Sequence, residues 1–248
     1  MGLKTGKGGV KDSLREQYEE AFAVHDNHEA CFESLGVAPQ HAVICIDGNV
    51  LMRQIPEIVD REATEHLPER SENATLADVV EIVTKRLLAF FRIVVAQVDA
   101  HRGLINKFQG DAALAVFGAP LRVDDPAAAA MSTARALADE LRSLPLDFGI
   151  GVSAGPVFAG NIGAENRYEY TVVGDAVNEA ARLADHAKEF GTRTLCSGTA
   201  RSPATPAERA CWIAAGQTTL RGRSTATDLF APRRPESPHP PHKTASTA

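Results

Sequence analysis

The chain has little cysteine, little tryptophan and no long apolar run, and each shortage excludes a class of protein. It has 248 residues with four cysteines and one tryptophan. The cysteines show neither a CxxC motif nor a metal-ligand spacing, which favours free thiols in a reducing compartment. No apolar run approaches the roughly 20 residues that cross a bilayer, and the basic first residues lack the apolar stretch of a secretory signal. We therefore expect a cytoplasmic protein without a membrane anchor.

Positive charge is not in excess either. The sequence carries 26 Lys and Arg against 32 Asp and Glu, a formal net charge of −6. Such a chain has no overall positive field for a polyanion, so we do not expect nucleic-acid binding. Hydrophobic residues make up 44% of the sequence, which is ordinary for a globular protein with a buried core.

Composition divides the chain into three parts. Residues 1–40 are polar, and apolar residues at helical spacing within residues 11–35 predict a helix. This helix either packs on the body or on a second subunit, or it is a loosely docked extension. Residues 41–232 form the compact body. Residues 233–248 are rich in proline, serine and threonine and predict a disordered tail.

Hydrophobic patterning in the body predicts alternating strands and helices. The expected elements are a strand at 41–47, a helix at 77–100, two strands within 103–120, a helix at 126–144, two strands within 146–162, a strand at 168–173, a helix at 174–190, a strand at 192–196 and a final strand near Leu229. The two apolar runs of 146–162 are split by Gly155-Pro156 and predict a second hairpin-like pair. The order predicts an α/β sandwich, a mostly antiparallel sheet with helices mostly on one face, built around a ferredoxin-like βαββαβ unit.

Several polar residues lie at the predicted turns and on one helix face. Asp111 lies at the tip of a predicted hairpin, where a carboxylate suits a hard cation, and Gly110 allows a positive φ. Lys107, in the preceding strand, is either an edge-strand charge or a buried donor. Asn178 and Arg182 are four residues apart on a predicted helix and therefore share a face. An amide and a guanidinium on that face can hold a sugar oxygen and a phosphate.

Three strings in order make this combination specific. INKFQGDAALAVFG, EYTVVGDAVNEAARL and TTLRGRS resemble the class III nucleotidyl cyclase catalytic domain over most of residues 85–232. The resemblance implies a homodimer with composite active sites at its interface and two Mg²⁺ or Mn²⁺ ions. It implies an adenylyl cyclase that converts ATP into 3′,5′-cyclic AMP and pyrophosphate.

The resemblance also assigns roles to the first of these residues. Asp111 matches the second of two metal-binding aspartates of one protomer. Lys107 and Thr171 match the purine-selecting pair and are similar to the adenine-selecting type. In that type lysine donates to adenine N1, and threonine accepts from the 6-amino group.

The remaining roles fall on the last two strings. Asn178 matches the residue that positions the ribose, and Arg182 matches the residue that stabilises the transition state. Arg221 matches a basic residue that holds the terminal phosphates, with Arg223 as a near alternative.

The family's first metal motif, a strand ending in Asp before a D-x-x-G-(F or S)-T turn, does not occur in this chain. Asp47 ends a good strand but is followed by GNVLMRQ, whereas Asp60 is nearer the next helix but follows a poor strand with Pro56. We favour Asp47, with Asp60 as the alternative. Residues 49–73 then form a longer connection than in the family. If neither carboxylate reaches the second metal, the chain is a weak or inactive cyclase-homology domain that binds nucleotide or dimerises.

Overall fold

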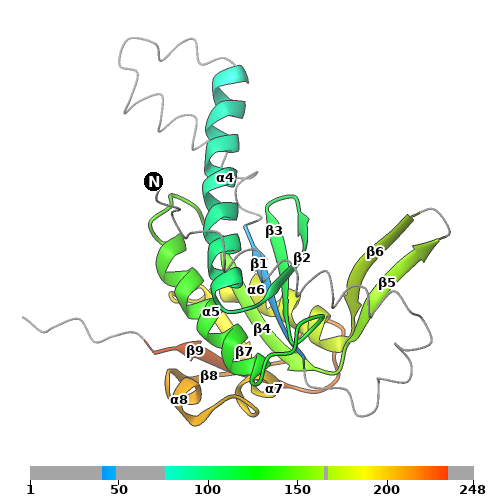
Figure 1. Ribbon diagram of the computed structural model, residues 1–248. Coiled ribbons are helices and arrows are strands. Elements are labelled where there is room, and N and C mark those ends of the chain that lie inside the picture. The colour runs from blue at the N-terminus through cyan, green and yellow to red at the C-terminus, as the bar shows by residue number, and fades with distance from the viewer. Residues whose placement is uncertain (1–40, 49–75, 165–166, 234–248) are drawn as a thin grey trace, which may run out of the picture.

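The computed structural model describes residues 41–48, 76–164 and 167–233 (Figure 1). The strands are β1 (His41–Asp47), β2 (Leu104–Gln109), β3 (Ala112–Phe117), β4 (Gly149–Gly155), β5 (Phe158–Ala164), β6 (Arg167–Val173), β7 (Thr194–Ser197), β8 (Trp212–Thr218) and β9 (Thr227–Pro232). The helices are α4 (Leu76–Ala100), α5 (Pro126–Leu141), α6 (Asp175–Ala187), α7 (Gly198–Arg201) and α8 (Pro206–Ala210). The helix expected within 11–35, the connection 49–73 with Asp60, and the tail from 234 lie outside the described residues.

One seven-stranded sheet forms the body, in the order β2-β3-β1-β4-β7-β9-β8. β1 pairs antiparallel with β3 and with β4, while β4 and β7 run parallel. The run HAVICID is β-branched and almost entirely buried, which suits a central strand packed on both faces. The expected α+β architecture with a mainly antiparallel sheet is confirmed.

Helices cover both faces of this sheet. Ala42, Ile44 and Ile46 of β1 belong to the core that α4 and α5 cover, whereas Val43 packs with the small residues of α6. Alternate residues of a strand point to opposite faces, so α6 lies across the sheet from the other two long helices. The helices therefore lie mostly on one face, as predicted, with α6 on the other. Among the described helices, none is long and apolar enough to span a bilayer.

The α6 helix lies directly on β4 because β4 carries glycine where the helix passes. A Cβ placed on Gly149 would lie 2.0 Å from the carbonyl oxygen of Ala184, and one on Gly151 would lie 2.1 Å from that of Ala180. Any side chain at either position would push the helix away from the strand. The two glycines thus fix the height of α6 above the sheet.

The expected hairpin of β4 with β5 is wrong. Both edges of β4 are occupied, by β1 and by β7, so β5 has no place beside it. β5 instead pairs antiparallel with β6, with Phe158 opposite Val173, and the two strands form a separate arm that projects from the body (Figure 1). The sequence pattern located both strands but did not identify their partners.

Candidate active site

The two carboxylates expected to bind metal lie on neighbouring strand ends. Asp47 is the last residue of β1, and Asp111 lies in the turn between β2 and β3, where Gly110 has φ 63° as predicted. The N–H of Gly48 donates to the backbone oxygen of Asp111 at 3.2 Å, and a Cβ on Gly48 would lie 3.6 Å from the Cβ of Asp111. The end of β1 therefore touches the hairpin tip. Asp60, the alternative partner, lies outside the described residues.

A lysine that the sequence analysis did not single out reaches the first of these carboxylates. Lys188 follows α6, and its Nζ lies 2.7 Å from Oδ2 of Asp47 and 3.2 Å from Oδ1 of Asp185. Burial alone would lower the pKa of Lys188, but hydrogen bonds and charge from Asp47 and Asp185 raise it overall. Lys188 therefore carries its positive charge at neutral pH.

The expected purine-selecting residues lie close together through a bulge in β2. The register of β2 against β3 shifts between Ile105 and Lys107, which sets Asn106 apart. Asn106 Nδ2 donates to the backbone oxygen of Tyr170 at 2.8 Å, and Thr171 Oγ1 donates to Asn106 Oδ1 at 3.3 Å. The bulge thus joins the edge strand β2 to β6.

Lys107 lies beside this junction. Its ammonium is 3.8 Å from a carboxylate oxygen of Glu169, and its side chain is 28% exposed against 62% for Glu169. Of the two interpretations of Lys107, its position fits a half-buried donor better than a solubilising charge, although β2 is the edge strand.

The remaining expected site residues, Asn178, Arg182 and Arg221, lie on α6 and in the loop before β9. Asn178 is exposed and Arg182 half-buried on the outer face of the helix, while the helix buries mainly alanine and leucine. A Cβ on Gly222 would lie 3.4 Å from Nη2 of Arg182. Arg221 precedes this glycine and is exposed. The structure therefore places Arg221 next to the segment that contacts Arg182.

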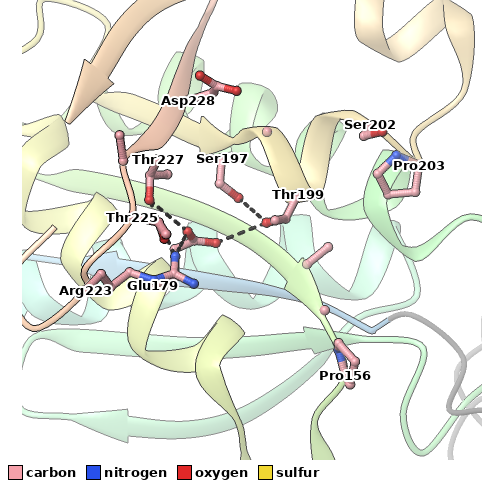
Figure 2. Close-up of a pocket in the computed structure, with 14 residues that line it drawn as sticks. Pro156, Glu179, Ser197, Thr199, Ser202, Pro203, Arg223, Thr225, Thr227 and Asp228 are labelled. Carbon is pink, nitrogen blue, oxygen red and sulfur yellow. Dashed lines mark hydrogen bonds and ion pairs between the residues drawn. The ribbon is translucent and has the colours of Figure 1, made fainter. Parts of the chain in front are cut away.

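Arg223, the alternative to Arg221, lies in a cluster of ion pairs. It forms ion pairs with Asp175 and with Glu179, whose side chain is 3% exposed. The carboxylate of Glu179 also accepts hydrogen bonds from Thr199 and Thr227 (Figure 2) and from Ser153. A buried carboxylate with this many donors is stable as an anion. Because its guanidinium is committed to this cluster, Arg223 is less suited than Arg221 to hold a phosphate.

A cavity of about 770 Å³ borders the Glu179 cluster, with Ser197, Thr199 and Asp228 in its wall (Figure 2). It lies at the Gly155 end of β4, which pairs with the start of β1. Asp47 is at the other end of β1, so the cavity and the two metal-site carboxylates lie at opposite ends of the sheet. We do not assign the cavity to the metal site.

The donor set suits a hard divalent cation. Asp47 and Asp111 offer carboxylate oxygens, which Mg²⁺ and Mn²⁺ prefer, and such sites commonly take further ligands from substrate phosphates and water. Within residues 41–48, 76–164 and 167–233, no group of three or more His, Cys, Asp or Glu could hold a metal by itself. By the chemistry of their oxygens, Asp47 and Asp111 are the residues that would hold such a cation, and nucleotide phosphates would add further ligands.

The sheet, the projecting arm and the carboxylates at the β1 end and hairpin tip together define a class III nucleotide cyclase domain. Residues 72–224 match the adenylate and guanylate cyclase catalytic domain family, and the chain belongs to that family. Solved structures share the fold. The adenylyl cyclase CyaB from P. aeruginosa has a TM-score of 0.59 at 21% identity, over 79% of this chain and 94% of that chain.

Other neighbours carry the opposite specificity in their names. The guanylyl cyclase Cya2 matches with a TM-score of 0.54 at 24% identity, over 82% of this chain and 96% of its own. The dimeric guanylyl cyclase domain of the RhoGC fusion protein from Blastocladiella emersonii matches with a TM-score of 0.54 at 18% identity, over 77% and 95%. The family is therefore clear, whereas the choice of purine is not set by these likenesses.

A relative in sequence is the uncharacterized protein MT1361 of Mycobacterium tuberculosis (strain CDC 1551 / Oshkosh). It is 49% identical over 179 residues, which are 71% of this chain and 31% of that protein. The chain thus spans about a third of the length of such curated relatives.

Sequence reasoning missed three residues of the site region, namely Asn106, Glu179 and Lys188. Glu179 lies inside the string VNEAARL, but a glutamate on an amphipathic helix ordinarily faces solvent. Asn106 could have been noticed as a polar residue in a strand, where asparagine is uncommon. Lys188 gives no local signal, because its partner Asp47 is 141 positions away.

Proposed function

We propose that the domain is an adenylyl cyclase that acts as a homodimer and converts ATP into 3′,5′-cyclic AMP and pyrophosphate. The observation that carries the choice of ATP is the hydrogen-bond chain from Thr171 through Asn106 to Tyr170. The Nδ2 of Asn106 faces a carbonyl, which fixes the orientation of the amide and turns Oδ1 toward Thr171. The hydroxyl hydrogen of Thr171 is thereby used, and its oxygen is left as an acceptor.

An acceptor at Thr171 and a donor at Lys107 match adenine. The 6-amino group of adenine donates and its N1 accepts, whereas guanine has an acceptor at O6 and a donor at N1. An ammonium offers three donors and no acceptor, so Lys107 repels the N1–H of guanine. Glu169 is largely exposed and pairs with Lys107 only at 3.8 Å, so the lysine can turn to a base.

The remaining roles follow the reaction. The ribose 3′-oxygen attacks the α-phosphorus, the bond to the bridging oxygen of the β-phosphate breaks, and the hydroxyl proton leaves to solvent. Bound cations at Asp47 and Asp111 would lower the pKa of the 3′-hydroxyl and neutralise phosphate charge. Asn178 holds the ribose, Arg182 stabilises charge that develops on the α-phosphate, and Arg221 binds the terminal phosphates.

The family resemblance implies a homodimer in which each active site is built from both protomers. Asn178 and Arg182 lie on the outer face of α6, while the carboxylate of Asp47 meets Lys188 just after its carboxyl end. Large apolar side chains are exposed on the arm and on β2, among them Phe158, Val173 and Phe108. Phe158 and Val173 are cross-strand partners, and exposed apolar side chains that lie together are typical of a protein–protein contact. A guanylyl cyclase domain described as a non-canonical dimer is among the structural neighbours.

Product formation tests the proposal. We expect cyclic AMP from ATP with Mn²⁺, little cyclic GMP from GTP, and no cyclic AMP with Asp111→Ala. Asp139→Ala is the matched control, because Asp139 is an exposed aspartate that pairs with Arg142, the residue just after its helix. Wild-type protein that makes no more cyclic AMP than Asp111→Ala would contradict the proposal.

A second candidate, a cyclase-homology domain that binds nucleotide or dimerises without turnover, is favoured by one observation. The carboxylate of Asp47 is already engaged by an ammonium at 2.7 Å. Calorimetry of ATP with Mn²⁺ separates the two functions, since binding without product supports the second.

A further inference from the structure

We infer that Lys188 is a built-in competitor of the divalent cation at Asp47, with Asp185 as the position to which its ammonium withdraws. The inference rests on the proposed function in one respect, the assignment of Asp47 as a metal ligand. It assigns the control of cation affinity to Lys188, a residue to which the family resemblance gives no role.

The geometry places the ammonium where a cation would bind. Nζ of Lys188 is 2.7 Å from Oδ2 of Asp47, and the two side chains are only 20% and 14% exposed. A charged hydrogen bond at this distance in a sheltered place is strong. A cation on the same oxygen would have to displace the ammonium or bear its repulsion.

Asp185 provides the second position. Its Oδ1 is 3.2 Å from the same Nζ, and its side chain is 71% exposed. It is three residues before Lys188, so the lysine can leave Asp47 and keep one carboxylate by rotating its side chain alone. The exposed pair is weaker because water screens it. In the absence of a competing cation, the ammonium therefore favours Asp47.

Cation affinity then depends on both partners of Lys188. A charge within 4–6 Å changes the proton affinity of a carboxylate by about 10- to 1000-fold, and the same field acts on a metal ion. Removing the ammonium should tighten cation binding, and removing Asp185 should weaken it. The competition also makes bare cation binding weak, so that nucleotide phosphates are needed to complete the site.

The test is a titration of the nucleotide-free full chain with Mn²⁺, followed by the electron paramagnetic resonance signal of the free ion. We expect Lys188→Met to lower the dissociation constant by about tenfold or more. Lys85→Met is the matched control, because Lys85 also pairs with a carboxylate at 2.7 Å, on the exposed side of α4, and we expect no change there. An unchanged or higher dissociation constant in Lys188→Met overturns the inference.

Asp185→Asn is the second variant and leaves the Lys188–Asp47 pair in place. It takes away the withdrawal position, and we expect the dissociation constant to rise by about two- to fivefold, the scale of an exposed ion pair. A fall in this variant also overturns the inference. Cyclic AMP formation is measured separately. Tighter Mn²⁺ binding in Lys188→Met with no cyclic AMP from any variant supports the inference and contradicts only the proposed cyclase activity.

Discussion

Ion pairs fix both ends of α6, but the two carboxylates differ in whether another ligand can replace their partners. At the amino end, Glu179 is buried and accepts from three hydroxyls and the guanidinium of Arg223. At the carboxyl end, Asp47 shares Lys188 with an exposed carboxylate. Four side chains from different elements hold the first carboxylate. The second is paired with the ammonium of Lys188, which has Asp185 as an alternative partner. A carboxylate of the first kind stabilises the fold, and one of the second kind can exchange ligands.

The largest effect should come from breaking the amino-end cluster. Glu179→Ala leaves the charge of Arg223 without its buried partner and removes the acceptor of Ser153, so we expect the free energy of unfolding to fall by about 3–5 kcal/mol. Urea unfolding followed by circular dichroism measures it. Asp139→Ala removes an exposed pair and should cost less than about 1 kcal/mol. Equal losses in the two variants would show that the cluster is no more structural than a surface pair.

The thiol of Cys45 probes the carboxyl end of α6, because the charges of Asp47 and Asp185 act on its pKa. Burial, and then the charges of Asp47 and Asp185, raise the pKa of its thiol to about 12. The thiol is therefore neutral at pH 8, and its alkylation should be about 100-fold slower in the folded protein than in urea. The folded rate should still rise with pH beyond pH 10, because the thiolate population grows until the pH reaches the raised pKa. Peptide mapping after timed iodoacetamide treatment measures both rates, and similar rates in urea and buffer would contradict this.

Arg182 tests the outer face between the two ends. Arg182→Lys keeps the charge but loses the planar fork, so we expect the turnover number for cyclic AMP to fall by about 30-fold with a smaller change in KM. Steady-state kinetics measure the two constants. Arg142→Lys, at the C-cap of α5, is the control. A change in KM alone would assign Arg182 to ground-state binding.

The smallest effect concerns the purine. Thr171→Val keeps the shape of the side chain and removes its acceptor, so the preference for ATP over GTP should fall by about tenfold. The ratio of kcat/KM for the two nucleotides measures it. Thr192→Val removes a hydroxyl that donates to a backbone oxygen elsewhere and should leave the ratio unchanged. An unchanged ratio in Thr171→Val as well would mean that Thr171 does not select the base.

Local patterns were sufficient for much of this fold. The β-branched run of β1 and the turn at Gly110 are both properties of a few neighbouring residues. The family and the α+β class followed from strings of the same local kind. The strings also assigned Lys107 and Thr171 to one site, and both residues lie where β2 contacts β6. The roles of the two residues remain predictions.

Features that depend on distant partners were not predictable in this way. The pairing of β5 with β6 follows from the occupied edges of β4, which no residue of β5 encodes. The bulge at Asn106 is visible only in the register of β2 against β3, and its contact with Tyr170 joins residues 64 positions apart. The contact of Lys188 with Asp47 joins residues far apart in sequence, and a lysine after a helix ordinarily means only a solvated charge.

The glycines under α6 have a mechanical consequence. The backbone of α6 lies directly on the backbone of β4 at Gly149 and Gly151. Sliding or tilting of α6 over β4 would cause collisions, so helix and sheet move as one rigid body. Asn178 and Arg182 lie on α6 and therefore keep a fixed position relative to the sheet. Under the proposed function, opening for nucleotide entry and product exit would then come from rotation of whole protomers or from a hinge in the segment that carries Arg221.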